Sequence, residues 1–133
     1  MVIDTSAFVA ILFDEPERRQ FIEAIEAGPT RLVSAATLVE SGIVVEARAG
    51  EVAGRELDLF VLRAGIDVVD VDLEQTELAR AAWRRFGKGR HPASLNYGDC
   101  FAYALAIRSA EPLLFKGSGF ALTDITASVH ETR

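Results

Sequence analysis

The sequence predicts an α/β fold in which helices cover both faces of a mostly parallel central sheet, giving three layers in one domain over residues 1–133. Short apolar runs alternate with longer stretches of helical periodicity, and strands that are separated by helices pair in parallel. Right-handed crossovers between parallel strands place helices on both faces of the sheet. Half of the 133 residues are hydrophobic, which suffices for a continuous core at this length.

Helix breakers divide the first half of the chain. Pro16, Gly28, Gly50 and Gly65 each stand at the end of a helical pattern, and Asp4 follows the first apolar run as a helix N-cap. In order, the expected elements are a strand at 1–4, a helix from the cap through Leu12, a helix at 17–27, a strand at 31–34, and helices at 35–49 and 51–64.

The second half alternates in the same way. The run 66–71 is rich in β-branched residues, which favour a strand, while Gly117 and Gly119 mark a turn near the end. In order, the expected elements are a strand at 66–71, a helix at 73–86, a loop at 87–92, a helix at 96–109, a strand at 112–115 and a short last strand that begins near Ile125.

The composition narrows the class of protein. No apolar stretch approaches the roughly 20 residues that cross a membrane, and no signal peptide is expected before the first strand. Cys100 is the only cysteine, so no internal disulfide forms and a cytoplasmic location is expected. Because Cys100 lies in an apolar helical run, we expect a buried core residue rather than a catalytic thiol.

Three acidic residues stand in apolar surroundings. Asp4 ends an apolar run, Glu40 lies on the apolar stripe of its helix, and Asp99 opens a small, apolar helix. Two of them have local explanations, because Asp4 suits a helix cap and Asn96 with Asp99 matches a capping box. Glu40 has none beyond a side chain that snorkels at the edge of the stripe. Ionised carboxylates in such places are costly unless something neutralises them.

Together the three acids predict a metal site. The carboxyl ends of parallel strands form the ligand crevice of an open α/β sheet. Mg²⁺ and Mn²⁺ prefer oxygen ligands and keep several waters, so two or three carboxylates suffice. The chain has no histidine and cysteine cluster with zinc spacing and no P-loop. A hydrolytic site in which a bound cation activates water is therefore the leading hypothesis.

The segments around these acids resemble a known family, the PIN-domain ribonucleases of the VapC toxin type, and the resemblance covers essentially the whole chain. The matching segments are 1–7 around Asp4, 36–40 ending at Glu40, 95–101 around Asp99, and 113–117 followed by Phe120 and 123–124. The resemblance implies a three-layer PIN-like fold, an acidic pocket for Mg²⁺ or Mn²⁺, and cleavage of RNA. It also implies a VapB-type antitoxin and a homodimer.

The same resemblance assigns roles to single residues. Asp4, Glu40 and Asp99 take the catalytic and metal-binding roles. Thr5, Ser6 and Asn96 are supporting residues, the first two as hydrogen-bond donors to a carboxylate or a phosphate. One departure stands out: many relatives carry another acid in the turn that here reads Gly117-Ser118-Gly119, and Asp124 is the candidate to replace it.

A basic stretch is the expected RNA contact. Residues 78–98 contain five basic side chains and no acid, in a chain whose net charge is −6. We expect Arg84, Arg85, Lys88 and Arg90 to neutralise phosphates beside the acidic pocket. The alternative interpretation is a solvated helix face and loop, which is usual for charge runs.

Two other classes of protein remain open from the residues. One is a receiver-like phosphoacceptor domain, with Lys116 after a late strand, although the acid pair of that class is missing after the first strand. The other is an inert PIN-like binding module, which the missing turn acid favours. The helices at 35–49 and 51–64 are candidate contact surfaces for partners, with core burial as the alternative.

Overall fold

The sheet has four strands that are all parallel. The structure, a computed structural model, describes residues 1–129. The strands β1 (Val2–Ile3), β2 (Leu32–Ser34), β3 (Asp67–Val69) and β4 (Leu113–Leu114) lie in the order β3-β2-β1-β4. Val2 is the register partner of Leu32 on one side and of Leu113 on the other. The predicted parallel sheet is confirmed, with β1 as an inner strand.

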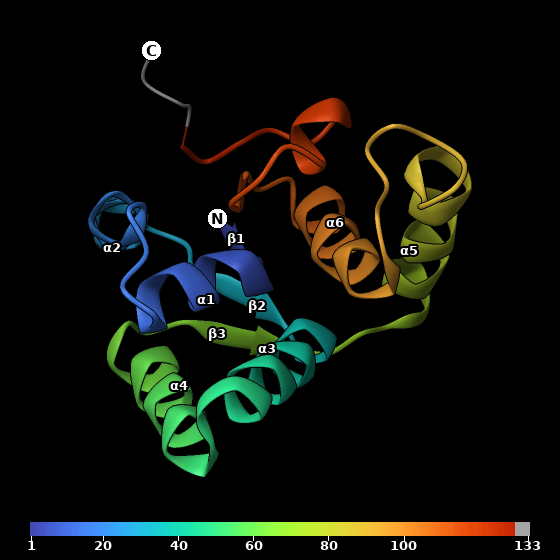
Figure 1. Ribbon diagram of the computed structural model, residues 1–133. Helices are drawn as coiled ribbons and strands as arrows, with labels where there is room; N and C mark the ends of the chain where they lie inside the picture. Colours follow the sequence, from blue (N-terminus) through green and yellow to red (C-terminus); the bar gives the residue numbers. More distant parts are fainter. Residues whose placement is uncertain (130–133) are drawn as a thin grey trace.

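Six helices connect and cover these strands (Figure 1), as the periodicity predicts. They are α1 (Thr5–Leu12), α2 (Arg18–Ala27), α3 (Ala35–Ala49), α4 (Glu51–Arg63), α5 (Leu73–Phe86) and α6 (Tyr97–Ser109), followed by a short 3-10 helix, η1 (Phe120–Leu122). The strand expected near Ile125 is reduced to a single bridge, in which Ala127 pairs with Leu113 at the free side of β4. The η1 turn takes up the chain before that bridge.

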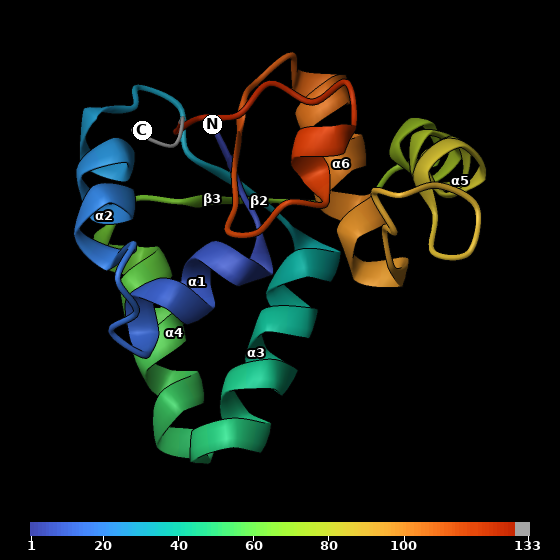
Figure 2. The ribbon, with the colours of Figure 1, turned by 45° about the horizontal axis from the view of Figure 1, so that its top comes forward.

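Successive strand residues point to opposite faces of the sheet, and each face has its own apolar core. Ile3, Val33 and Leu114 pack with α1 to α4, whereas their neighbours Val2 and Leu113 pack with α5 and α6. Figures 1 and 2 show α5 and α6 together on one side of the molecule, on the opposite side from α2 and α4. The predicted three-layer arrangement is therefore confirmed.

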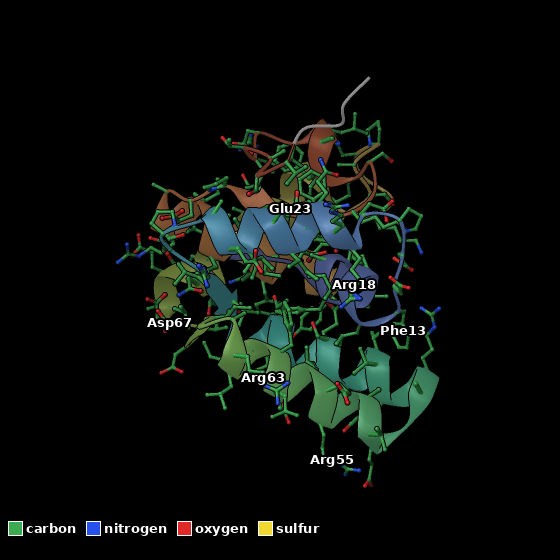
Figure 3. The ribbon with its side chains drawn as sticks, turned by 90° about the vertical axis from the view of Figure 1, so that its left-hand side faces the viewer. Phe13, Arg18, Glu23, Arg55, Arg63 and Asp67 are labelled. Carbon is green, nitrogen blue, oxygen red and sulfur yellow. The ribbon has the colours of Figure 1, made fainter. Side chains whose placement is uncertain are left out.

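The outer helix faces leave some apolar side chains in solvent. Figure 3 views the side formed by α2 and α4, which carry Glu23 and Arg63. On α3 and α4, Val39, Ile43 and Leu62 are each more than 60% exposed. Core burial, the alternative to a contact surface, therefore does not account for these three residues. Within residues 1–129, no helix is long and apolar enough to cross a membrane.

The strand order reverses at β1. The chain adds β2 and then β3 on one side of β1 and returns to add β4 on the other side. Ligands of open α/β sheets bind outside the carboxyl ends of the strands at such a reversal of strand order. Asp4, the first residue after β1, stands at this point.

Candidate active site

Asp4 is a helix cap and a buried acid at once. Its Oδ2 accepts hydrogen bonds from the Ser6 backbone N–H at 3.0 Å and from the Ser6 hydroxyl at 2.6 Å. The residue is only 3% exposed, and its Oδ1 is buried without a hydrogen-bond partner among the described residues. Burial raises the pKa of Asp4 to about 6, with smaller contributions from the charges of Asp99 and Glu40.

Ser6 is itself held by the loop after β4. The backbone N–H of Lys116 donates to the Ser6 hydroxyl oxygen at 2.9 Å. The Lys116 ammonium group lies 3.1 Å from a carboxylate oxygen of both Glu15 and Glu17, which follow α1. Ser6 thus links the Asp4 carboxylate to the end of β4, and it supports Asp4 as the sequence predicts.

Glu40 reaches the same place from α3. Its Oε1 accepts a hydrogen bond from the Thr5 hydroxyl at 2.6 Å, and the buried Ser41 hydroxyl lies 3.0 Å from that of Thr5. The other side of the Glu40 carboxylate rests against Gly98, where a Cβ would overlap with it. Glu40 therefore lies between the first turn of α1 and the first turn of α6.

Asp99 completes the predicted capping box at the start of α6. The Asn96 side chain accepts from the Asp99 backbone N–H at 2.9 Å, and Asp99 Oδ2 accepts from the Asn96 backbone N–H at 3.0 Å. Burial raises the pKa of Asp99, its hydrogen bond from Asn96 opposes that shift, and the nearby charge of Glu40 adds to it. The local cap and the acidic neighbourhood are both present.

The negative charges of the three carboxylates repel one another. A divalent cation bound between them would offset this repulsion. The buried, unpartnered Oδ1 of Asp4 and the oxygen-only donor set fit Mg²⁺ or Mn²⁺. Over residues 1–129, no group of three acid, histidine or cysteine side chains stands close enough together to hold a metal ion as drawn. The residues fit the cation in the chemistry of their donor atoms.

Asp124 is held away from the three acids. Its Oδ1 accepts a hydrogen bond from the Tyr103 hydroxyl at 2.7 Å, and its Oδ2 is 3.5 Å from the Arg85 guanidinium group. The structure does not bring this carboxylate to the three acids, because the middle of α6 and the end of α5 hold it. Arg85 is engaged in the same contact, and its guanidinium group also lies 4.6 Å from the centre of the Phe86 ring.

The other basic residues follow the outer side of α5 and its loop. Arg84 and Lys88 line a groove between α5 and the start of α6. Arg90 packs its guanidinium group 4.7 Å from the centre of the Trp83 ring and donates to the Arg84 carbonyl. Cys100 is buried as expected, and burial raises the pKa of its thiol to about 11.

Sequence reasoning missed two residues of the site. Ser41 supports the Thr5–Glu40 pair, and Gly98 leaves room for the Glu40 carboxylate. A glycine in the first turn of a helix, one residue before an acid, was a usable signal because glycine lowers helix propensity. Ser41 carried no such signal.

The raised pKa of Asp4 predicts how the stability of the metal-free protein depends on pH. A folded-state pKa of about 6, above the ordinary 3.8, adds stability that is complete below pH 4 and is lost as the pH rises through 6. In EDTA, Asp4→Asn should therefore gain roughly 1–2 kcal/mol relative to the wild type between pH 5 and pH 8. Urea unfolding at both pH values measures this, and an unchanged difference would contradict it.

Comparisons with known proteins identify the family of the chain. The PIN domain family matches residues 1–125. Ribonuclease VapC of Mycolicibacterium smegmatis is 57% identical over 130 residues, which cover 98% of this chain and 100% of that protein. Ribonuclease VapC30 of Mycobacterium tuberculosis is 58% identical over 125 residues, covering 94% and 95% of the two chains.

One solved structure shares the fold. The crystal structure of VapC20 of Mycobacterium tuberculosis, a toxin that cleaves the sarcin–ricin loop, matches with a TM-score of 0.78 over 98% of both chains, at 16% identity. The predicted resemblance is confirmed by the matches in sequence, and the predicted fold by this one. The chain therefore belongs to the PIN domain family and, within that family, to the VapC ribonucleases.

Proposed function

We propose that this VapC ribonuclease hydrolyses RNA phosphodiester bonds at the site formed by Asp4, Glu40 and Asp99, with Mg²⁺ or Mn²⁺ as cofactor. The observation that carries the proposal is the Asp4 carboxylate, which is buried at the carboxyl end of an inner strand with one oxygen free of hydrogen bonds among the described residues. The names of its relatives, which are ribonucleases, support the reaction class.

Different residues of the site would bind the cation, orient its ligands and position the attacking water. Asp4 and Asp99 would hold the cation, which when bound lowers the pKa of a water and offsets charge on a phosphoryl oxygen. Ser6 fixes the orientation of Asp4, and Asn96 fixes that of Asp99. Glu40, which Thr5 holds at 2.6 Å, is placed to orient the attacking water.

The receiver-like domain is excluded, whereas the inert PIN-like module is not. The family match excludes a receiver-like domain, and Lys116 is occupied by Glu15 and Glu17. An inert PIN-like module shares the fold and the family, so only activity separates it from the enzyme. The intact set of three acids argues for the enzyme.

Partners are part of the proposal. VapC ribonucleases are toxins of toxin–antitoxin pairs, which implies a VapB-type antitoxin for this chain. An arginine or lysine of that antitoxin would find a partner in the acidic pocket. The exposed apolar residues Val39, Ile43 and Leu62 support a protein contact on α3 and α4, either with the antitoxin or in a homodimer. A cytoplasmic location remains a prediction from the single cysteine.

Loss of the metal-binding carboxylates tests the reaction. Asp4→Asn and Asp99→Asn should each lower the rate of RNA cleavage by about 100-fold or more, because a bound cation stabilises the transition state by several kcal/mol. EDTA should abolish cleavage, and Mn²⁺ should restore it. Asp58→Asn, on the exposed side of α4, is the matched control and should cleave at the wild-type rate. Cleavage that survives both variants and EDTA would refute the metal mechanism.

Two glycines test the position of Glu40. In Gly98→Ala the new methyl group displaces the Glu40 carboxylate, so RNA cleavage should fall roughly 10- to 100-fold. Gly42→Ala, inside α3 with no atom near the new methyl group, should keep full activity and gain about 0.5–1 kcal/mol of stability. Rate assays and thermal unfolding on both variants measure this. Equal activity of the two would remove Glu40 from the mechanism.

The salt dependence of RNA binding tests the basic stretch. Arg84 and Lys88 are the better pair to replace, because Arg85 is engaged by Asp124. In Arg84→Ala/Lys88→Ala, the slope of log affinity against log salt should become shallower by about 1.4, or about 0.7 per lost phosphate contact. Arg55→Ala on α4 is the control. An unchanged slope would favour the solvated-face interpretation.

A further inference from the structure

A groove between α5 and the start of α6 lies next to the acidic site. It has a volume of about 820 Å³, within the roughly 300–1,000 Å³ of sites that take small organic groups. Its floor is apolar, with Ala79, Leu95 and Cys100 buried beneath it. In Figures 1 and 2, α5 and α6 lie side by side at one end of the molecule.

Aromatic rings stand at the groove in solvent. Tyr97 is 82% exposed and Trp83 is 46% exposed, although both belong to well-formed helices. The Tyr97 and Phe101 rings meet edge to face, with centroids 4.9 Å apart. Exposed aromatic rings that gather at one concave surface are typical of a binding site rather than of a plain helix face.

The charge around these rings is positive. Arg80, Arg84 and Lys88 line the groove, and no lining residue is an acid. Over the part of the chain that the structure describes, none of these three forms an ion pair. Stacking rings beside free cations suit a single-stranded nucleic acid, whose bases have apolar faces and whose phosphates are anionic. A protein segment would offer no such match of flat rings and regular negative charge.

Two residues that line the groove adjoin the acidic site. Asn96 lines the groove and also holds Asp99 through the capping box. Tyr97 is followed directly by Gly98, against which the Glu40 carboxylate rests. The groove and the acids are therefore joined through the first turn of α6.

We propose that this groove binds an unpaired RNA base next to the bond that is cut, with the base stacked on Tyr97 or Trp83 and the flanking phosphates paired with Arg80, Arg84 and Lys88. The proposal rests on the ribonuclease function above and adds the residues that would contact the base and its flanking phosphates. A paired base is already stacked in its helix and cannot reach the rings without unpairing.

Trp83 reports on the occupant directly because it is the only tryptophan in the chain. A five-nucleotide RNA of mixed sequence, titrated in EDTA so that no cleavage occurs, should quench its fluorescence. An otherwise identical strand with abasic sugars should quench it far less, since it keeps the phosphates and lacks the rings. Equal quenching by both strands, or by neither, would overturn the proposal, and in the second case the groove would be a protein-contact face.

Variants at Tyr97 test whether its aromatic ring, rather than a bulky apolar side chain, is needed to bind RNA. Tyr97→Leu should weaken binding of the five-nucleotide RNA about 5- to 100-fold, whereas Tyr97→Phe should bind it as the wild type does. Leu62→Ala, which is similarly exposed on α4, should also bind normally. Wild-type affinity in Tyr97→Leu would overturn the stacking role. That result, with cleavage still dependent on Asp4 and Asp99, would leave the proposed function standing.

Discussion

The buried carboxylate of Asp4 is the constraint around which this end of the molecule is arranged. It is placed by an inner strand whose neighbours flank it on both sides, so it cannot turn to bulk water. Ser6 satisfies one of its oxygens, and the loop after β4 fixes Ser6 in turn. The second oxygen remains without a partner among the described residues, beside two further acids. Packing on both faces of the sheet holds this unfavourable arrangement in place.

Helix capping and catalysis use the same residues without conflict. α1, α3 and α6 all begin near the carboxyl edge of the sheet, capped by Asp4, Ser34 and Asn96 with Asp99. Each acidic cap accepts its hydrogen bonds on Oδ2, so its other oxygen is left for a ligand. The positive ends of these helices also moderate the repulsion among the acids. The caps predicted at Asp4 and Asp99 are confirmed, and their role as metal ligands stays a prediction that these caps leave room for.

Periodicity and breakers predicted nearly every element, because most helices bury one face and α2, α3 and α5 end directly before a glycine. The run 66–71 was predicted too long, because β3 is an edge strand that pairs only with the three residues of β2. Contacts between distant residues were beyond the sequence. Nothing local shows that Tyr103 and Arg85 hold Asp124, or that Ser41 lies beside Thr5.

The proposed RNA-binding groove and the three acids lie on opposite sides of the start of α6. The acids on one side repel RNA, and over residues 1–129 no basic residue contributes to the pKa shifts of Asp4 and Asp99. The cations and rings on the other side attract it and are joined to the acids through Asn96, Tyr97 and Gly98. Binding energy gained in the groove is then available to bring a phosphate against carboxylates that would otherwise reject it. In the proposed mechanism, the groove selects the RNA, and the three acids carry out the hydrolysis.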